Sequence, residues 1–187
     1  LIDALRRPDL AEFASNPLLL TVMSLVHTQD KVLPEHRAVL YERTVDILLW
    51  RWEATKHEGE PALLQQLRQA GRSEADLLRV LRQQAFEAHR QAVGSDRAAG
   101  IDANGLTVAL TRLHPGKDMG WAENLTELMR QRTGLLVERE PGVFAFPHRT
   151  FQEYLAATDL ALDDHYEKRA VELARDGDYW REVILLS

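Results

Sequence analysis

The stretch FAFPHRTFQEYLAA, residues 144–157, changes from a strand-like pattern to a helical pattern within a few positions. Aromatic and β-branched residues dominate 143–146, which is typical of a strand. From 149 to 162 the apolar residues recur at helical spacing, so we expect a helix with one buried side. That side comprises Phe151, Tyr154, Leu155 and Leu162. His148 stands at the junction, where it either caps the helix or has a role beyond the turn.

The residues on either side of this stretch predict a winged helix. LLVER (135–139) and VFAF (143–146) form one β-hairpin over about 135–146, and Pro141-Gly142 suits a type II turn because glycine accepts a positive φ. Helices are expected after a Ser73 cap, around 106–113 and over 121–133, with a glycine-rich loop at 93–105. Three helices, a hairpin and a further helix over 76–162 have the order of a winged helix.

The first part of the chain predicts a separate helical unit, so the expected fold class is mainly α. Asn16 is a good helix cap, and Pro17 suits the first helical position because its missing N–H would be unpaired there. A second helix is expected to open at Pro34 and to cover 35–56. We expect a helical domain at 1–60, a linker with a short helix at 61–75, a winged-helix domain at 76–163 and a further helical region at 164–187.

The composition excludes several classes of function. Of the 187 residues 45% are apolar and 28% are charged, and the net charge is −6, so a folded protein with an ordinary surface is expected. There is no cysteine, which excludes disulfides and thiolate metal sites and fits a cytoplasmic location. The longest apolar run is too short to span a membrane. Because the chain begins with Leu1 rather than Met, we expect it to be part of a longer protein.

No catalytic motif is recognisable in the sequence. The one Gly-Lys pair, Gly116-Lys117, is followed by Asp118 and lacks the earlier glycine of a P-loop. The seven histidines include no pair at i, i+4 that could hold zinc on a helix. Whether the chain takes part in an enzyme is therefore left open, and no catalytic or metal-binding residue is predicted.

Three segments carry a resemblance to a known family. NPLLLTVMSLVH (16–27), continued by LPEHRAVLYERTVDILLWRW (33–52), resembles the first helical domain of NACHT-type STAND nucleoside triphosphatases, which are NLR-like signalling proteins. FAFPHRTFQEYLAA (144–157) resembles the end of their winged-helix domain. DYWREVILLS (178–187) resembles the start of the helical region that follows.

The resemblance implies a regulatory role. It implies that Pro17 lies beside the adenine of a nucleotide held by a P-loop domain before Leu1, and that His148 hydrogen-bonds the β-phosphate of ADP. The cofactor of the longer protein would be ATP or ADP with Mg²⁺. Exchange of ADP for ATP would release the contact and allow a homo-oligomer to assemble, in defence or stress signalling. The isolated chain is expected to bind nucleotide weakly or not at all.

Two other functions remain open at this stage. A winged helix can bind DNA, but 76–160 holds 10 Lys and Arg against 11 Asp and Glu, a net charge of −1, whereas a DNA-binding face is normally basic. A plain helical adaptor would use His148 only as a helix cap. We therefore expect the chain's own P-loop domain as its partner, and neither nucleic acid nor a membrane.

Overall fold

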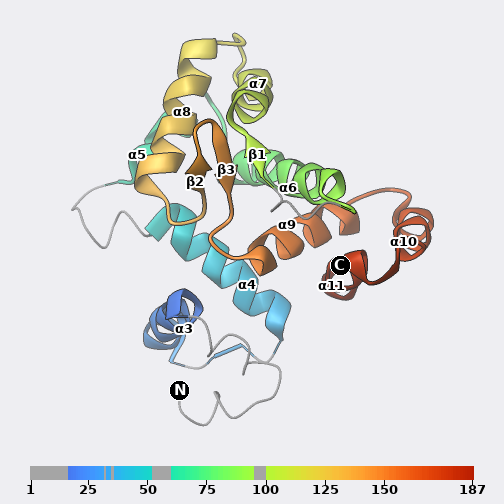
Figure 1. Ribbon diagram of the computed structural model, residues 1–187. Helices are drawn as coiled ribbons and strands as arrows, with labels where there is room; N and C mark the ends of the chain where they lie inside the picture. Colours follow the sequence, from blue (N-terminus) through green and yellow to red (C-terminus); the bar gives the residue numbers. More distant parts are fainter. Residues whose placement is uncertain (1–16, 32, 35, 52–59, 95–99) are drawn as a thin grey trace.

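The computed structural model describes residues 17–31, 33–34, 36–51, 60–94 and 100–187, and Figure 1 shows how their elements are arranged. The α-helices are α3 (Pro17–Asp30), α4 (Arg37–Asp46), α5 (Ala62–Gln69), α6 (Glu74–Gln91), α7 (Ala103–Leu113), α8 (Met119–Arg132), α9 (Arg149–Ala161), α10 (Tyr166–Ala174) and α11 (Arg181–Leu186). A π-helix η1 (Ile47–Arg51) extends α4, and a 3₁₀-helix η2 (Gly177–Trp180) precedes α11. The strands are β1 (Ile101–Asp102), β2 (Val137–Glu140) and β3 (Val143–Ala145). The expected mainly α fold with a small β wing is confirmed.

The hairpin forms where the sequence predicted it. β2 and β3 are antiparallel, and Gly142 at the turn has φ +77°, which a residue with a Cβ adopts only at a cost. A third strand, β1, pairs with the other edge of β3 and sets Ile101 opposite Phe144. The predicted loop at 93–105 is therefore wrong in its last part, because Ile101 and Asp102 join the sheet and Asp102 caps α7.

Helix α9 lies in the centre of the packing. Every residue from Phe151 to Ala157 is buried, and α9 packs against α6, α4 and α11 (Figure 1). On the α4 side, the Tyr41 ring meets Phe151 edge-on at 6.1 Å and stacks with Tyr154 at 5.6 Å between centroids. The predicted buried side of this helix is confirmed except for Leu162, which is 68% exposed because α9 has ended at Ala161.

The second helix begins later than Pro34 and changes type before it ends. It starts at Arg37, after His36 in an extended conformation, and the prediction for 52–56 lies outside the described residues. In its π-helical end, Ile47 to Trp50 are all buried. The carbonyl of Leu48 accepts a hydrogen bond from the Gly134 amide at 3.1 Å. This bond ties the first helical unit to the segment that enters the hairpin.

One apolar core joins the two predicted units. It runs from Leu19 in α3 through Leu48 to Leu81 in α6 and Leu155 in α9. The domain boundaries predicted near 60, 75 and 163 stay predictions, because a shared core does not define them. Within the described residues, none of the helices is long and apolar enough to cross a membrane.

Replacing Phe151 tests whether α9 organises this core. Phe151 is fully buried beside Tyr41, so Phe151→Ala leaves a cavity and lowers the free energy of unfolding by about 3–5 kcal/mol in a urea titration of the chain. Leu162→Ala is the control, since its side chain is mostly exposed and the expected change is below about 0.5 kcal/mol. A loss below about 1 kcal/mol for Phe151→Ala would contradict the central place of α9.

Candidate functional site

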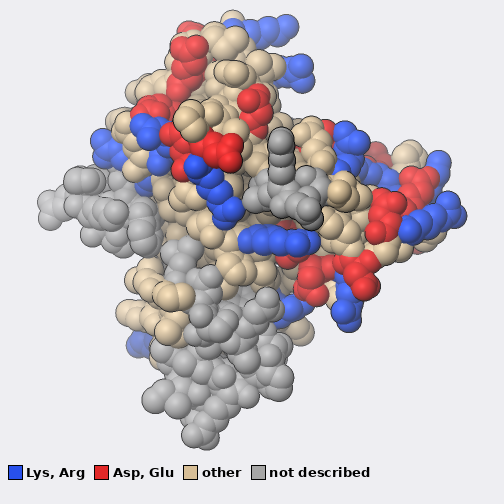
Figure 2. All heavy atoms as spheres, viewed as in Figure 1, with Lys and Arg blue, Asp and Glu red and all other residues tan. Residues whose placement is uncertain are grey.

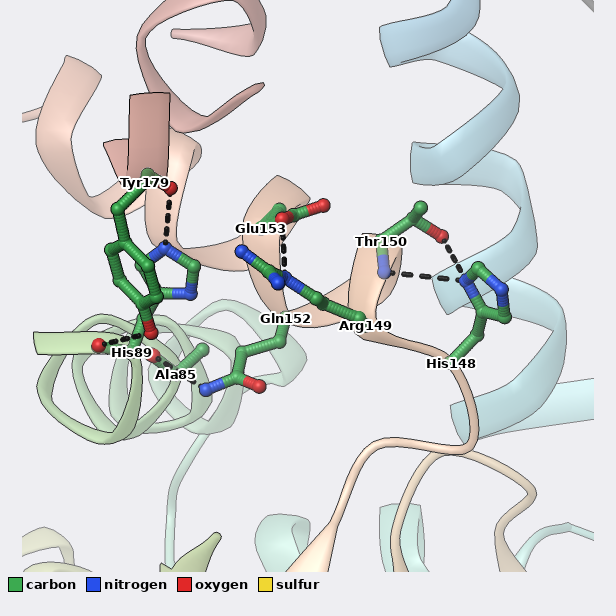
Figure 3. Close-up of polar contacts among 8 residues, drawn as sticks. All are labelled: Ala85, His89, His148, Arg149, Thr150, Gln152, Glu153 and Tyr179. Carbon is green, nitrogen blue, oxygen red and sulfur yellow. Dashed lines mark hydrogen bonds and ion pairs between the residues drawn. The ribbon is translucent and has the colours of Figure 1, made fainter. Parts of the chain in front are cut away.

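His148 is the N-cap of α9. Its backbone is extended (φ −141°, ψ 143°), and its ring turns back over the first turn of the helix (Figure 3). The Nδ1 atom accepts a hydrogen bond from the Thr150 backbone N–H at 3.3 Å and lies 2.9 Å from the Thr150 hydroxyl. One of the free amides at the helix start is thereby satisfied. His148 therefore acts as the helix cap, one of the two roles that the sequence left open.

This cap determines which ring nitrogen carries the proton. A backbone amide can only donate, so Nδ1 is an acceptor, and in the neutral ring the hydrogen is on Nε2. The ring is half-buried, and Nε2 has no hydrogen-bond partner in the described part of the chain. His148 therefore presents one N–H donor at the positive end of a helix, where an anion is favoured.

Pro17 lies on a different helix from His148. It is the exposed first residue of α3, as predicted, while Asn16 lies outside the described residues. Helices α3 and α9 both pack against α4, which lies between them in Figure 1. No interaction of the described residues joins Pro17 to His148, and the two nucleotide contacts stay predictions.

Arg149 is held by the fold and is not simply solvated. Its Nε donates to Glu153 Oε1 at 2.8 Å, and its guanidinium carbon lies 5.3 Å from the centre of the Tyr179 ring. The Glu153 side chain is only 7% exposed, so its charge depends on partners such as Arg149. Figure 3 shows Arg149 extending away from the His148 ring, toward Tyr179.

A buried polar cluster lies beyond Arg149. His89 is 1% exposed, and its ring lies 4.4 Å from the Tyr179 ring and 4.7 Å from that of Trp180. Its Nε2 lies 3.4 Å from the Tyr179 carbonyl, while the Tyr179 hydroxyl donates to the His89 carbonyl at 2.8 Å. Burial lowers the pKa of His89 to about 4, opposed by the bond to Tyr179 and reinforced by the charge of Arg149. The ring is therefore neutral near pH 7.

The comparisons with known proteins assign the fold to a family. Residues 37–160 match the family described as the winged helix-turn-helix domain C-terminal to NACHT. The chain belongs to this family. No curated protein and no solved structure gives a significant match. The match confirms the NACHT resemblance of the sequence, and it covers α4, η1, the hairpin and nearly all of α9.

The surface that winged helices use for DNA carries mixed charges here. On α8, Arg130 pairs with Glu127, and its other terminal nitrogen lies 3.7 Å from Glu138 of the wing. Figure 2 shows acidic and basic residues interspersed on the face that carries the hairpin, without a continuous basic patch. Helix α5 also packs against α8, and the Trp121 indole donates to the Gln66 carbonyl at 3.3 Å. Arg130 of α8 is thus paired with acidic residues of its own helix and of the wing.

Near His148 the structure groups His89 and Tyr179, which the sequence did not single out for function. Among the residues that the structure describes, no group of three His, Asp or Glu side chains could hold a metal ion. His89 was recognisable as a polar residue at a buried helical position, in line with Leu77, Leu81 and Ala85. Its partner Tyr179 is 90 residues away, and no local pattern joins the two.

A variant that removes the side-chain cap of α9 should be less stable than a variant that replaces it. His148→Ala loses the bond to Thr150 N–H and lowers the free energy of unfolding by about 1 kcal/mol. His148→Asn supplies a side-chain oxygen at the same position and stays within about 0.5 kcal/mol of the wild type. Urea titrations measure both values. Equal losses in the two variants would show that the ring does not act as a cap.

His89 makes stability depend on pH. In the unfolded chain the ring takes up a proton near its ordinary pKa of 6.5, whereas in the folded chain it does so only near pKa 4. Its contribution is full above about pH 6.5 and is lost as the pH falls from about 6.5 to 4, by at most about 3 kcal/mol. Urea titrations at several pH values should show a flatter dependence for His89→Gln. His165→Gln, at an exposed histidine, is the control, and an unchanged slope for His89→Gln would contradict the assignment.

Proposed function

We propose that this winged-helix domain senses the nucleotide held by a preceding NACHT domain, with His148 donating to the β-phosphate of ADP. The supporting observation is that the two nitrogens of its ring have different surroundings. Nδ1 is occupied by the cap of α9, and Nε2–H is left without a partner in the part of the chain that the structure describes. The hairpin before His148 and the buried helix after it hold the ring at a fixed place.

The expected strength of the contact suits a switch. A hydrogen bond to a charged partner contributes about 1.5–3 kcal/mol, which corresponds to a shift of roughly 10- to 150-fold in a two-state equilibrium. This is enough to favour an ADP-bound off state without making it permanent. ATP would then replace ADP, the contact would be released and the protein would assemble into a homo-oligomer.

The remaining parts of the proposal lie outside this chain. The P-loop and Mg²⁺ would belong to the NACHT domain, so the isolated chain is expected to bind ATP or ADP weakly. Pro17, exposed at the start of α3, is proposed to lie against the adenine. The absence of cysteine is consistent with the proposed cytoplasmic location. The pairing of Arg130 with Glu127 on α8 favours a protein partner over nucleic acid.

The experiment compares His148 variants in the protein that contains the NACHT domain. His148→Ala and His148→Asn both remove the Nε2–H donor, so both should speed release of a fluorescent ADP analogue by roughly 10-fold or more and raise the spontaneously assembled fraction. Release is followed by stopped-flow fluorescence and assembly by mass photometry.

The matched control is Ser73→Ala, at the N-cap of α6. Ser73 caps that helix through the Asp76 amide, so its loss lowers stability by a similar amount without touching the proposed nucleotide contact. ADP release from Ser73→Ala should equal that of the wild type. Unchanged release from His148→Asn would overturn the proposal and leave His148 as a helix cap.

A further inference from the structure

We propose that Arg149 and Tyr179 couple the start of α9 to the C-terminal segment 177–186, so that the position of the His148 ring depends on whether this segment is docked. The coupling rests on contacts within the chain. Its use in nucleotide sensing rests on the proposed function.

The C-terminal segment is docked on α6 and α9. Trp180 and Val183 are fully buried against α6 and α9, and the Trp180 ring lies 5.2 Å from Phe86. An ion pair from Arg37 in α4 to Glu182 in α11, at 3.1 Å, adds a second anchor. Helix α10, which precedes the segment, contains no buried residue. Tyr179, Ile184 and Leu186 pack around the buried pair, so the segment is docked on α6 and α9.

Tyr179 is the residue of this segment that reaches the start of α9. Its hydroxyl donates to the His89 carbonyl, its ring stacks near the His89 ring, and its outer face meets the guanidinium of Arg149 at 5.3 Å. A cation over an aromatic face within about 6 Å is attracted by the ring. Tyr179 thus joins three elements, α6, η2 and α9, at one point (Figure 3).

Arg149 links Tyr179 to the start of α9, where His148 is the cap. Its guanidinium is fixed on one side by Glu153, one turn along α9, and on the other by Tyr179. Its backbone directly follows the residue whose ring caps the helix. When Tyr179 leaves, Arg149 loses one of its two restraints, and the first turn of α9 gains freedom that shifts the His148 ring. Arg149 and Tyr179 are therefore positioning residues for His148, and neither is proposed as a nucleotide ligand.

The first test uses the chain without nucleotide. Tyr179→Leu removes the ring that Arg149 faces, whereas Tyr179→Phe keeps the ring and loses only the hydroxyl bond to His89. The imidazole carbon–proton signal of His148 is followed by NMR, and amide hydrogen exchange is measured at 148–151 and 177–186. Leu185→Ala, at an exposed position of the same segment, is the control.

The coupling predicts that Tyr179→Leu moves the His148 signal. It also predicts that amide exchange at 148–151 becomes roughly two- to fivefold faster, which is the change expected when a cation–aromatic contact is lost. Tyr179→Phe should retain the wild-type His148 signal, and Leu185→Ala should change neither. If Tyr179→Leu loosens only 177–186 and leaves His148 unchanged, the coupling is wrong and Tyr179 merely anchors the segment.

The second test uses the protein with its NACHT domain. Coupling between two sites is reciprocal, so ADP should slow exchange at 177–186, and Tyr179→Leu should speed ADP release while Tyr179→Phe does not. A His148 signal that responds to Tyr179→Leu, together with ADP release that responds to no His148 variant, would keep the coupling and reject the nucleotide role. Release that responds to His148→Asn but not to Tyr179→Leu would keep the nucleotide role and reject the coupling.

Discussion

The enclosure of α9 constrains the whole structure. Seven successive residues, Phe151 to Ala157, are buried, so the helix touches other elements on every side over two turns. Tyr41 of α4 packs on it from one direction and α6 along its length, while Trp180 and Val183 cover its far end. Over these residues the helix has little freedom to slide or rotate, whereas its first turn is held by the His148 cap and by the contacts of Arg149.

The place of His148 at the start of α9 underlies both its structural role and the signalling role proposed for it. Nδ1 stabilises the helix through the Thr150 amide, and the same bond leaves the proton of the neutral ring on Nε2. A donor at a helix N-terminus is suited to a phosphate oxygen. Arg149, the next residue, is directed toward Glu153 and Tyr179. In the proposed function the anion contact thus belongs to His148, and the contacts within the fold belong to Arg149.

Local sequence patterns predicted most of the fold and the position of His148 at the start of α9. The hairpin followed from β-branched and aromatic residues and from Pro141-Gly142, and the start of α9 followed from the change of period after His148. Strand β1 was missed because two residues carry no periodicity, and its pairing with β3 depends on a contact more than 40 positions away. His89 and Tyr179 were missed as partners because their contact is made only in the folded chain.

The most direct test of this account is the tautomer of His148, read from the ¹⁵N shifts of its ring in long-range ¹H–¹⁵N NMR spectra of the chain at a pH where the ring is neutral. The account predicts an unprotonated Nδ1 and a protonated Nε2, with the same assignment in Tyr179→Phe. A neutral ring with its hydrogen on Nδ1 would contradict it, because such a ring could neither cap α9 through that nitrogen nor offer an Nε2–H to a phosphate.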